Sequence, residues 1–215
     1  MDPDTLTSLQ SSYDRVAEEY ARRIYNELKD KPLDRQLLDN LAERIANQGI
    51  ICDMGCGPGH IARYLLERGA DVMGIDLSAG QVEQARRLNP GIEFRQGNML
   101  DLDIPDGAWA GIAAFYSIIH IPRSDVASAL RELKRTLQPG GLLLLAFHVG
   151  DEVVHLDEWW GENVCADFVF FQPEEMSGCL ESAGFEIINT VLRPPYPEVE
   201  HPSHRAYILA QKPVA

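Results

Sequence analysis

The residues best suited to chemistry lie in a glycine-rich turn at residues 53–59, with the sequence Asp-Met-Gly-Cys-Gly-Pro-Gly. The apolar residues 50–52 before it predict a short buried strand. Glycines at alternate positions let the main chain turn tightly and let a ligand approach the backbone where a Cβ would collide. A helix predicted over residues 60–68, ending at Gly69, supplies unpaired N–H groups at its start. The turn therefore predicts a cradle for a cofactor.

The spacing of the glycines helps to identify the class of cofactor. A dinucleotide-binding turn requires G-x-G-x-x-G, but the third glycine position is His60. The pattern is instead Asp-x-Gly-x-Gly-x-Gly, with Asp53 two residues before the first glycine. A second strand predicted over residues 70–76 ends in Asp76, which is placed to accept hydrogen bonds from two ribose hydroxyls. The missing glycine therefore counts against a dinucleotide.

Two further motifs follow in order, Gly-Asn-Met at 97–99 and Pro-Gly-Gly at 139–141 before a hydrophobic strand. Together with the glycine turn and Asp76, they make the chain resemble the class I S-adenosylmethionine (SAM)-dependent methyltransferases of the small-molecule type, over roughly residues 10–147. The resemblance implies a Rossmann-like α/β fold with helices on both faces of a seven-stranded, mostly parallel sheet. The implied strand order is 3-2-1-4-5-7-6, with the seventh strand antiparallel. SAM is the implied cofactor and S-adenosylhomocysteine (SAH) the product.

The resemblance also implies which residues contact the cofactor. These expected contacts are Tyr13, Tyr20, Asp53, Gly55, Cys56, Gly57, Asp76, Leu77, Gln81, Asn98, Met99, Phe115 and Tyr116. Asn98 stands where the family commonly has an acid that contacts the adenine amino group, and an asparagine carbonyl can accept the same bond. Met99 is expected to pack on the adenine ring.

Residues 7–29 predict an amphipathic helix, because apolar residues recur at spacings of three and four. Periodicity alone favours core positions for its two tyrosines, Tyr13 and Tyr20. Residues 12–20 also resemble the family motif Y-D-x-x-A-x-x-Y, which lies across the active-site mouth. The resemblance favours a cofactor contact for Tyr20, where a ring face attracts the sulfonium, and leaves Tyr13 undecided. With a second helix predicted over 34–47, residues 1–47 are expected to form a helical cap.

Two histidines are candidates for a general base, which methyl transfer needs only if the acceptor arrives protonated. His120 follows the predicted fourth strand and matches a histidine frequently found in the family; it either removes a proton or simply packs below the site. His148, at the end of the fifth strand, is the second candidate. His201 and His204 lack a third ligand at a recognisable spacing, so no metal is expected.

The connection at residues 148–171 is unusually long and rich in aromatic and acidic residues, which is typical of a lid. Asp157 and Glu158 with Trp159 and Trp160 either form an anionic aromatic pocket for a cationic amine or shield the reaction from water. The sequence leaves both interpretations open.

The remaining elements follow from hydrophobic periodicity and turn residues. Helices are predicted over 78–88, 124–137 and 173–184, and strands over 92–95, 110–116, 142–147, 185–193 and 205–211.

Composition limits the class of protein. With 215 residues and 45% hydrophobic content, the chain fits one methyltransferase domain over residues 1–215, as either a monomer or a homodimer. Its net charge of −14 argues against nucleic acid and favours a small neutral or cationic acceptor. Four cysteines without a C-x-x-C pair indicate a reduced, cytoplasmic protein. No signal peptide or apolar run of membrane-spanning length is found.

The predicted function is SAM-dependent methylation of an O, N or S atom of a small molecule. One alternative is an NAD-dependent oxidoreductase, against which the missing third glycine and the absence of a Tyr-x-x-x-Lys pair both count. Another is a SAM-binding regulatory protein without catalysis, because binding residues can survive the loss of chemistry.

Overall fold

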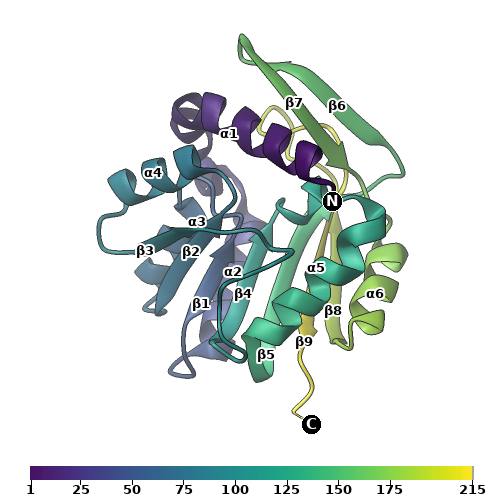
Figure 1. Ribbon diagram of the computed structural model, residues 1–215. Coiled ribbons are helices and arrows are strands. Elements are labelled where there is room, and N and C mark those ends of the chain that lie inside the picture. Colours follow the sequence, from purple (N-terminus) through teal and green to yellow (C-terminus); the bar gives the residue numbers. More distant parts are fainter. Residues whose placement is uncertain (215) are drawn as a thin grey trace.

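A seven-stranded sheet forms the centre of the computed structural model, which describes residues 1–214 (Figure 1). Its strands are β1 (Ile51–Met54), β2 (Val72–Asp76), β3 (Glu93–Gln96), β4 (Trp109–Phe115), β5 (Leu137–His148), β8 (Glu186–Arg193) and β9 (Arg205–Gln211). The order across the sheet is β3-β2-β1-β4-β5-β9-β8, and only β9 runs antiparallel to its neighbours β5 and β8 among these described strands. Because β6 and β7 form a separate sheet, β8 and β9 are the sixth and seventh strands of the main one. The predicted order 3-2-1-4-5-7-6 is therefore confirmed.

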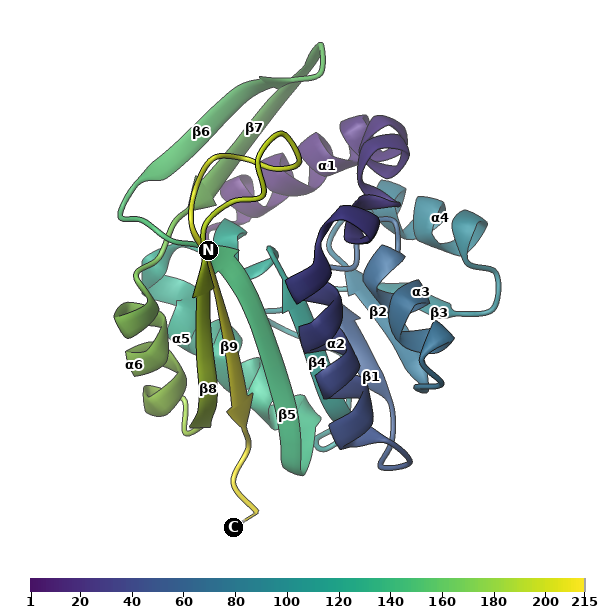
Figure 2. The same ribbon diagram turned by 180° about the vertical axis from the view of Figure 1, so that it is seen from behind.

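Helices cover both faces of the sheet (Figures 1 and 2). α5 (Arg123–Thr136) and α6 (Pro173–Ser182) pack on one face, and α2 (Pro32–Ile45) and α3 (His60–Glu67) pack on the other. α4 (Ala79–Leu88) lies against β2 and β3. Strands buried on both faces have few polar residues, which explains the unbroken apolar run in β5: its alternate residues enter two different cores.

The first helix differs from its predicted bounds. α1 (Pro3–Ile24) begins four residues early because the carboxylate of Asp2 caps it, accepting a hydrogen bond of 2.9 Å from the Thr5 N–H. The predicted continuation to residue 29 is wrong, since a short 3₁₀ turn, Glu27–Asp30, follows α1 as a separate element. Among residues 1–214, no helix is both long and apolar enough to cross a membrane.

The long connection after β5 folds into a hairpin of β6 (Val153–Trp159) and β7 (Glu162–Val169), which the sequence analysis missed. Its turn is Trp160-Gly161, and both residues have positive φ, +54° and +86°. Two-residue hairpin turns of type I′ require positive φ at both residues and usually place asparagine or aspartate before the glycine, so a tryptophan obscured the signal. The hairpin stands beyond the carboxyl edge of the parallel strands, beside α1 (Figure 1).

Helix α1 bridges α4 and the hairpin. On one side, Asp14 Oδ1 accepts hydrogen bonds from Ser78 Oγ at 2.6 Å and from the Gly80 N–H at 2.8 Å. The helices touch closely there, since a Cβ on Gly80 would lie 3.1 Å from the Asp14 Cα. On the other side, Ser12 Oγ accepts a bond of 2.8 Å from the Cys165 N–H in β7, and Arg15 donates to the Asn163 carbonyl. α1 and the hairpin therefore cover the carboxyl edge of the sheet together, and we call this cover the roof.

Replacing Asp14 with alanine should loosen this roof. Two donors, one of them the buried Ser78 hydroxyl, lose their acceptor, so we expect the free energy of unfolding to fall by about 1–3 kcal/mol. Urea denaturation measures the loss. Glu18→Ala, on the exposed face of α1, is the matched control. Equal stability of the two variants would show that α1 is not held at Asp14.

Candidate functional site

The glycine turn follows β1 at the carboxyl edge of the sheet, as predicted. Gly55 and Gly57 both have positive φ, +73° and +51°, a region that other residues rarely adopt. A Cβ on Gly55 would collide with the side chain of Ser117, whereas one on Gly57 would lie 3.4 Å from the Tyr20 ring. The turn is therefore limited to glycine at both positions, by backbone strain and, at Gly55, also by crowding.

Asp76 ends β2 and contacts the same turn. Its Oδ2 accepts a hydrogen bond of 2.8 Å from the Gly57 N–H, and its Oδ1 accepts one of 2.9 Å from the Ser78 N–H. Each carboxylate oxygen has a second lone pair for another donor. Burial raises the pKa of Asp76 to about 6, although these two main-chain bonds oppose that effect. The carboxylate thus joins the turn to the start of α4 while keeping acceptor capacity.

A cavity that is partly open to solvent lies beside these residues. Most of the predicted site residues line it: Tyr13, Tyr20, Gly55, Gly57, Asp76, Leu77, Asn98, Met99, Phe115, Tyr116 and His120. Ten further lining residues were not predicted as site residues: Met1, Leu6, Leu9, Gln10, Met54, Ile75, Ser78, Gly97, Ser117 and Ile121. Ser117 follows the predicted fourth strand directly, so its position at the sheet edge was the available signal.

Four predicted site residues lie outside this lining. Asp53 is buried behind the turn, where its Oδ2 accepts a bond of 3.0 Å from the Ala62 N–H in α3 and burial raises its pKa to about 7. Cys56 and Gln81 are also buried. His148 is separated from the cavity by Tyr116, with 5.2 Å between the ring centroids. The contact of these four residues with a cofactor stays a prediction.

Asn98 and Met99 follow β3 and line the same cavity as the glycine turn. The Asn98 side-chain carbonyl accepts a hydrogen bond of 3.0 Å from the Leu100 N–H, which stabilises the local turn. That oxygen keeps one lone pair for the bond expected from an adenine amino group.

Aromatic residues from opposite ends of the chain meet over the sheet edge, as predicted. Trp159 packs edge-on against Tyr13 and Tyr20, with centroids 5.5 and 5.6 Å apart. Trp160 lies against Trp159 at 4.9 Å, and the Arg23 guanidinium covers it at 4.8 Å. This packing favours the shielding role for the tryptophans, because Arg23 already contacts Trp160 as a cation.

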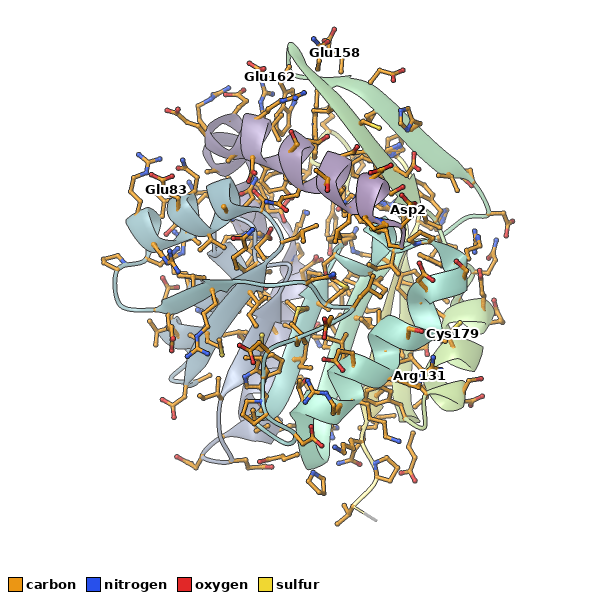
Figure 3. All side chains as sticks on the ribbon, in the orientation of Figure 1. Asp2, Glu83, Arg131, Glu158, Glu162 and Cys179 are labelled. Atoms are coloured by element: carbon orange, nitrogen blue, oxygen red, sulfur yellow. The ribbon has the colours of Figure 1, made fainter. Side chains whose placement is uncertain are left out.

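The acidic residues at the hairpin tip do not join this cluster. Figure 3 labels Glu158 and Glu162 at the far end of the hairpin, away from the sheet, and both are exposed. Asp157 is exposed as well. The predicted anionic aromatic pocket is therefore not assembled at this tip.

His120 forms hydrogen bonds through both ring nitrogens. Its Nδ1 lies 2.8 Å from the Asp167 main-chain carbonyl in β7, and its Nε2 lies 2.7 Å from the Tyr13 hydroxyl. Because a carbonyl only accepts, Nδ1 carries the proton and Nε2 of the neutral ring accepts from Tyr13. Burial lowers the pKa of His120 to about 4 and raises that of Tyr13 well above its ordinary value. The hairpin main chain therefore sets the tautomer of His120.

His148 is held differently. Its ring stacks on Phe170, with centroids 4.8 Å apart, and its Nδ1 lies 2.8 Å from Ser203 Oγ. Burial and then the nearby Arg205 lower its pKa to about 3. No group of three or more His, Cys, Asp or Glu side chains within residues 1–214 is arranged to hold a metal.

Removing the Tyr13 hydroxyl should raise the pKa of His120. A hydrogen bond donated to the neutral ring disfavours its protonation, so Tyr13→Phe should shift the pKa upward from about 4 by about one unit. Nitrogen-15 NMR of the imidazole measures it, and Tyr20→Phe is the control. An unshifted pKa in Tyr13→Phe would contradict the assigned tautomer.

The low pKa of His120 also affects stability. Between pH 6.5 and 4 the unfolded chain binds a proton at His120 that the folded chain does not, so this residue lowers the free energy of unfolding as pH falls.

Comparison with known proteins agrees with this geometry. Residues 51–141 match the family model of the methyltransferase domain. A malonyl-[acyl-carrier protein] O-methyltransferase of Enterobacter lignolyticus is 28% identical over 164 residues, covering 74% of this chain and 61% of the relative. A probable SAM-dependent methyltransferase of Mycolicibacterium smegmatis is 29% identical over 157 residues, covering 70% and 57%. The chain thus spans about three fifths of the length of these two relatives.

Solved structures share the fold across the whole chain. The DhpI–SAH complex is 22% identical, covers 100% of both chains and has a TM-score of 0.74. Magnesium protoporphyrin IX methyltransferase from Synechocystis PCC 6803 is 18% identical, covers 98% of both chains and has a TM-score of 0.71. Residues 51–141 therefore match the methyltransferase-domain model that the motifs predicted, and the whole chain shares the fold of these solved methyltransferase structures.

Proposed function

We propose that this protein transfers a methyl group from SAM to an O, N or S atom of a small-molecule acceptor. The observation that carries the proposal is the position of Asp76, whose carboxylate borders the cavity beside the glycine turn. An ionised acid at this position suits the two ribose hydroxyls of a nucleoside cofactor. The family match over residues 51–141 supports the same cofactor.

The chemistry of the lining fits SAM. Asp76 would hold the ribose, Met99 would pack on the adenine, and Tyr13 and Tyr20 would offer aromatic rings to a cation. When bound, SAM supplies an electrophilic methyl group for in-line displacement. The residues of this chain would hold the acceptor in line and exclude water, which is the contribution of the roof formed by α1 and the hairpin.

Tyr13 and His120 would receive the proton of an acceptor that arrives protonated. The Tyr13 oxygen could accept that proton while its own proton passes to Nε2 of His120. A pKa of about 4 makes His120 a weak base in the resting state, which suits acceptors that acidify as the methyl group is transferred. His148, outside the lining and with a pKa of about 3, is the weaker candidate.

Two alternatives remain separable by experiment. A regulatory SAM-binding protein would bind the cofactor without turnover, and an NAD-dependent oxidoreductase would bind NAD. The acyl-carrier-protein substrate in the name of the first relative belongs to that protein, of which this chain spans 61%. We further propose a single domain over 1–215, with a lid at 148–171, in a cytoplasmic monomer or homodimer. Of the cap predicted over 1–47, α1 keeps that role, whereas α2 packs on a face of the sheet.

SAH affinity should depend on the ionisation of Asp76. Because the pKa of Asp76 in the free protein is about 6, lowering the pH from 7 to 5 should weaken SAH binding about tenfold. Asp76→Asn should bind about 1.5–3 kcal/mol more weakly at pH 7, the scale of a hydrogen bond to a charged group, and should lose the pH dependence. Calorimetry measures both effects, with Asp71→Asn, an exposed acid at the start of the same strand, as control. Unchanged affinity in Asp76→Asn would refute the cofactor assignment.

Turnover of SAM against a panel of small-molecule acceptors tests catalysis itself. Formation of SAH with at least one acceptor is expected, together with no measurable NAD binding. SAH binding without turnover on any acceptor would favour the regulatory alternative, and NAD binding would favour the oxidoreductase.

Ligand binding should also protect the roof. The contacts of α1 with the hairpin close over the cavity, so amide exchange in residues 10–25 and 150–170 should slow when SAH binds. The scaffold helix α6 serves as the internal reference. Unchanged exchange in both segments would mean that they are static and that Tyr20 is simply a core residue.

A further inference from the structure

A group of buried charges lies next to the cofactor cavity but outside its lining. It contains three cations and three anions: Lys31, Arg193, Arg205, Glu27, Asp34 and Glu200. Apart from Glu27, these side chains are at most 7% exposed. Such burial makes every charge in the group depend on its partners.

Glu200 is the one carboxylate that contacts all three cations. It accepts two hydrogen bonds from Arg193 and lies 3.4 Å from Arg205 and 3.7 Å from Lys31. The Tyr196 N–H donates a further bond of 2.7 Å to it. Burial raises the pKa of Glu200, but the bonds from Arg193 and Tyr196 outweigh this effect and lower it below its ordinary value. The carboxylate is therefore ionised, held as a bound carboxylate ligand would be.

The other two anions form no ion pair with Arg205. Asp34 pairs with Arg193 at 3.1 Å, and Glu27 pairs with Lys31 at 2.8 Å. Arg205 has no carboxylate partner except Glu200 among the described residues, and its buried Nε has no hydrogen-bond acceptor within residues 1–214. Without Glu200, the group would hold one excess positive charge.

This group adjoins the cavity through a single aromatic ring. The Lys31 ammonium lies 5.5 Å and the Arg205 guanidinium 5.8 Å from the ring centroid of Tyr116, which lines the cavity. Tyr116 has a φ of +54°, and its hydroxyl lies 3.2 Å from that of Tyr207. Tyr116 therefore borders both the cavity and two of the three cations, Lys31 and Arg205.

Glu200 comes from the loop between β8 and β9, not from the sheet itself. Residues 194–204 form neither helix nor strand and join Arg193, at the end of β8, to Arg205, at the start of β9. Figure 2 shows this loop at the same edge of the sheet as α1 and the hairpin. The two arginines are fixed by the strands, while the carboxylate between them is carried by the loop.

We propose that Lys31, Arg193 and Arg205 form a binding site for a carboxylate group of the methyl acceptor, and that Glu200 occupies this site while no acceptor is bound. Exchange of one carboxylate for another keeps the buried charges balanced. The identification of the ligand as the acceptor rests on the proposed function, whereas the carboxylate site itself does not. The net charge of −14 favoured a neutral or cationic acceptor, but a net charge does not show where the cations of the chain lie.

Acetate is the probe, and Glu200→Gln opens the site. The variant should melt at a lower temperature than the wild type, and acetate should raise its Tm saturably by about 2–4 °C. Sodium chloride at equal ionic strength should not reproduce this shift. Glu198→Gln, on the same loop but exposed, should respond to acetate no more than the wild type. Adding Arg205→Met to Glu200→Gln should abolish the acetate effect.

A second measurement needs no variant. In the wild type, saturating acetate should displace Glu200 and speed amide exchange at Tyr196, whose N–H donates to that carboxylate. No acetate-specific Tm shift in Glu200→Gln, or no change at Tyr196, would overturn the inference and leave Glu200 as a permanent ion pair. SAH calorimetry on both proteins separates the two proposals: normal SAH binding with no acetate effect overturns only the carboxylate site, whereas absent SAH binding overturns the proposed function.

Discussion

The carboxylate of Asp76 is shared between the protein main chain and the cavity, and the rest of the site depends on this constraint. Its bonds to the N–H groups of Gly57 and Ser78 hold the end of β2, the glycine turn and the start of α4 in one arrangement. Burial makes ionisation costly in the absence of a ligand, which raises the pKa to about 6. The hydroxyl donors of a ribose would reduce that cost, so the ionised carboxylate is better stabilised with a ligand than without one.

Helix α1 connects this part of the site to the hairpin. One of its faces is held at α4 by Asp14, and the opposite face is held at β7 by Ser12. Tyr13 therefore lies between the cofactor turn and the hairpin, where its hydroxyl bonds to His120. The Asp167 carbonyl of the same hairpin orients that ring, so the hairpin and the histidine that we propose as a proton acceptor are held together.

The sheet and the cofactor half of the site could be predicted because their signals are local. Strands buried on both faces are apolar throughout, and the turn at Gly55 and Gly57 requires glycine for its backbone. The hairpin was missed because its turn begins with Trp160 rather than asparagine. The contacts of Glu200 were beyond prediction, because a glutamate in a proline-rich loop has the sequence pattern of an exposed residue. Its burial depends on cations distant in the chain.

A crystal structure with SAH bound tests the central claim most directly, because it locates the nucleoside relative to Asp76. We expect both ribose hydroxyls within hydrogen-bond distance of the Asp76 carboxylate, the adenine against Met99, and Tyr20 over the amino-acid portion of the ligand. SAH bound away from Asp76, or an Asp76 carboxylate that contacts only the Gly57 and Ser78 main chain while SAH is present, would contradict the account.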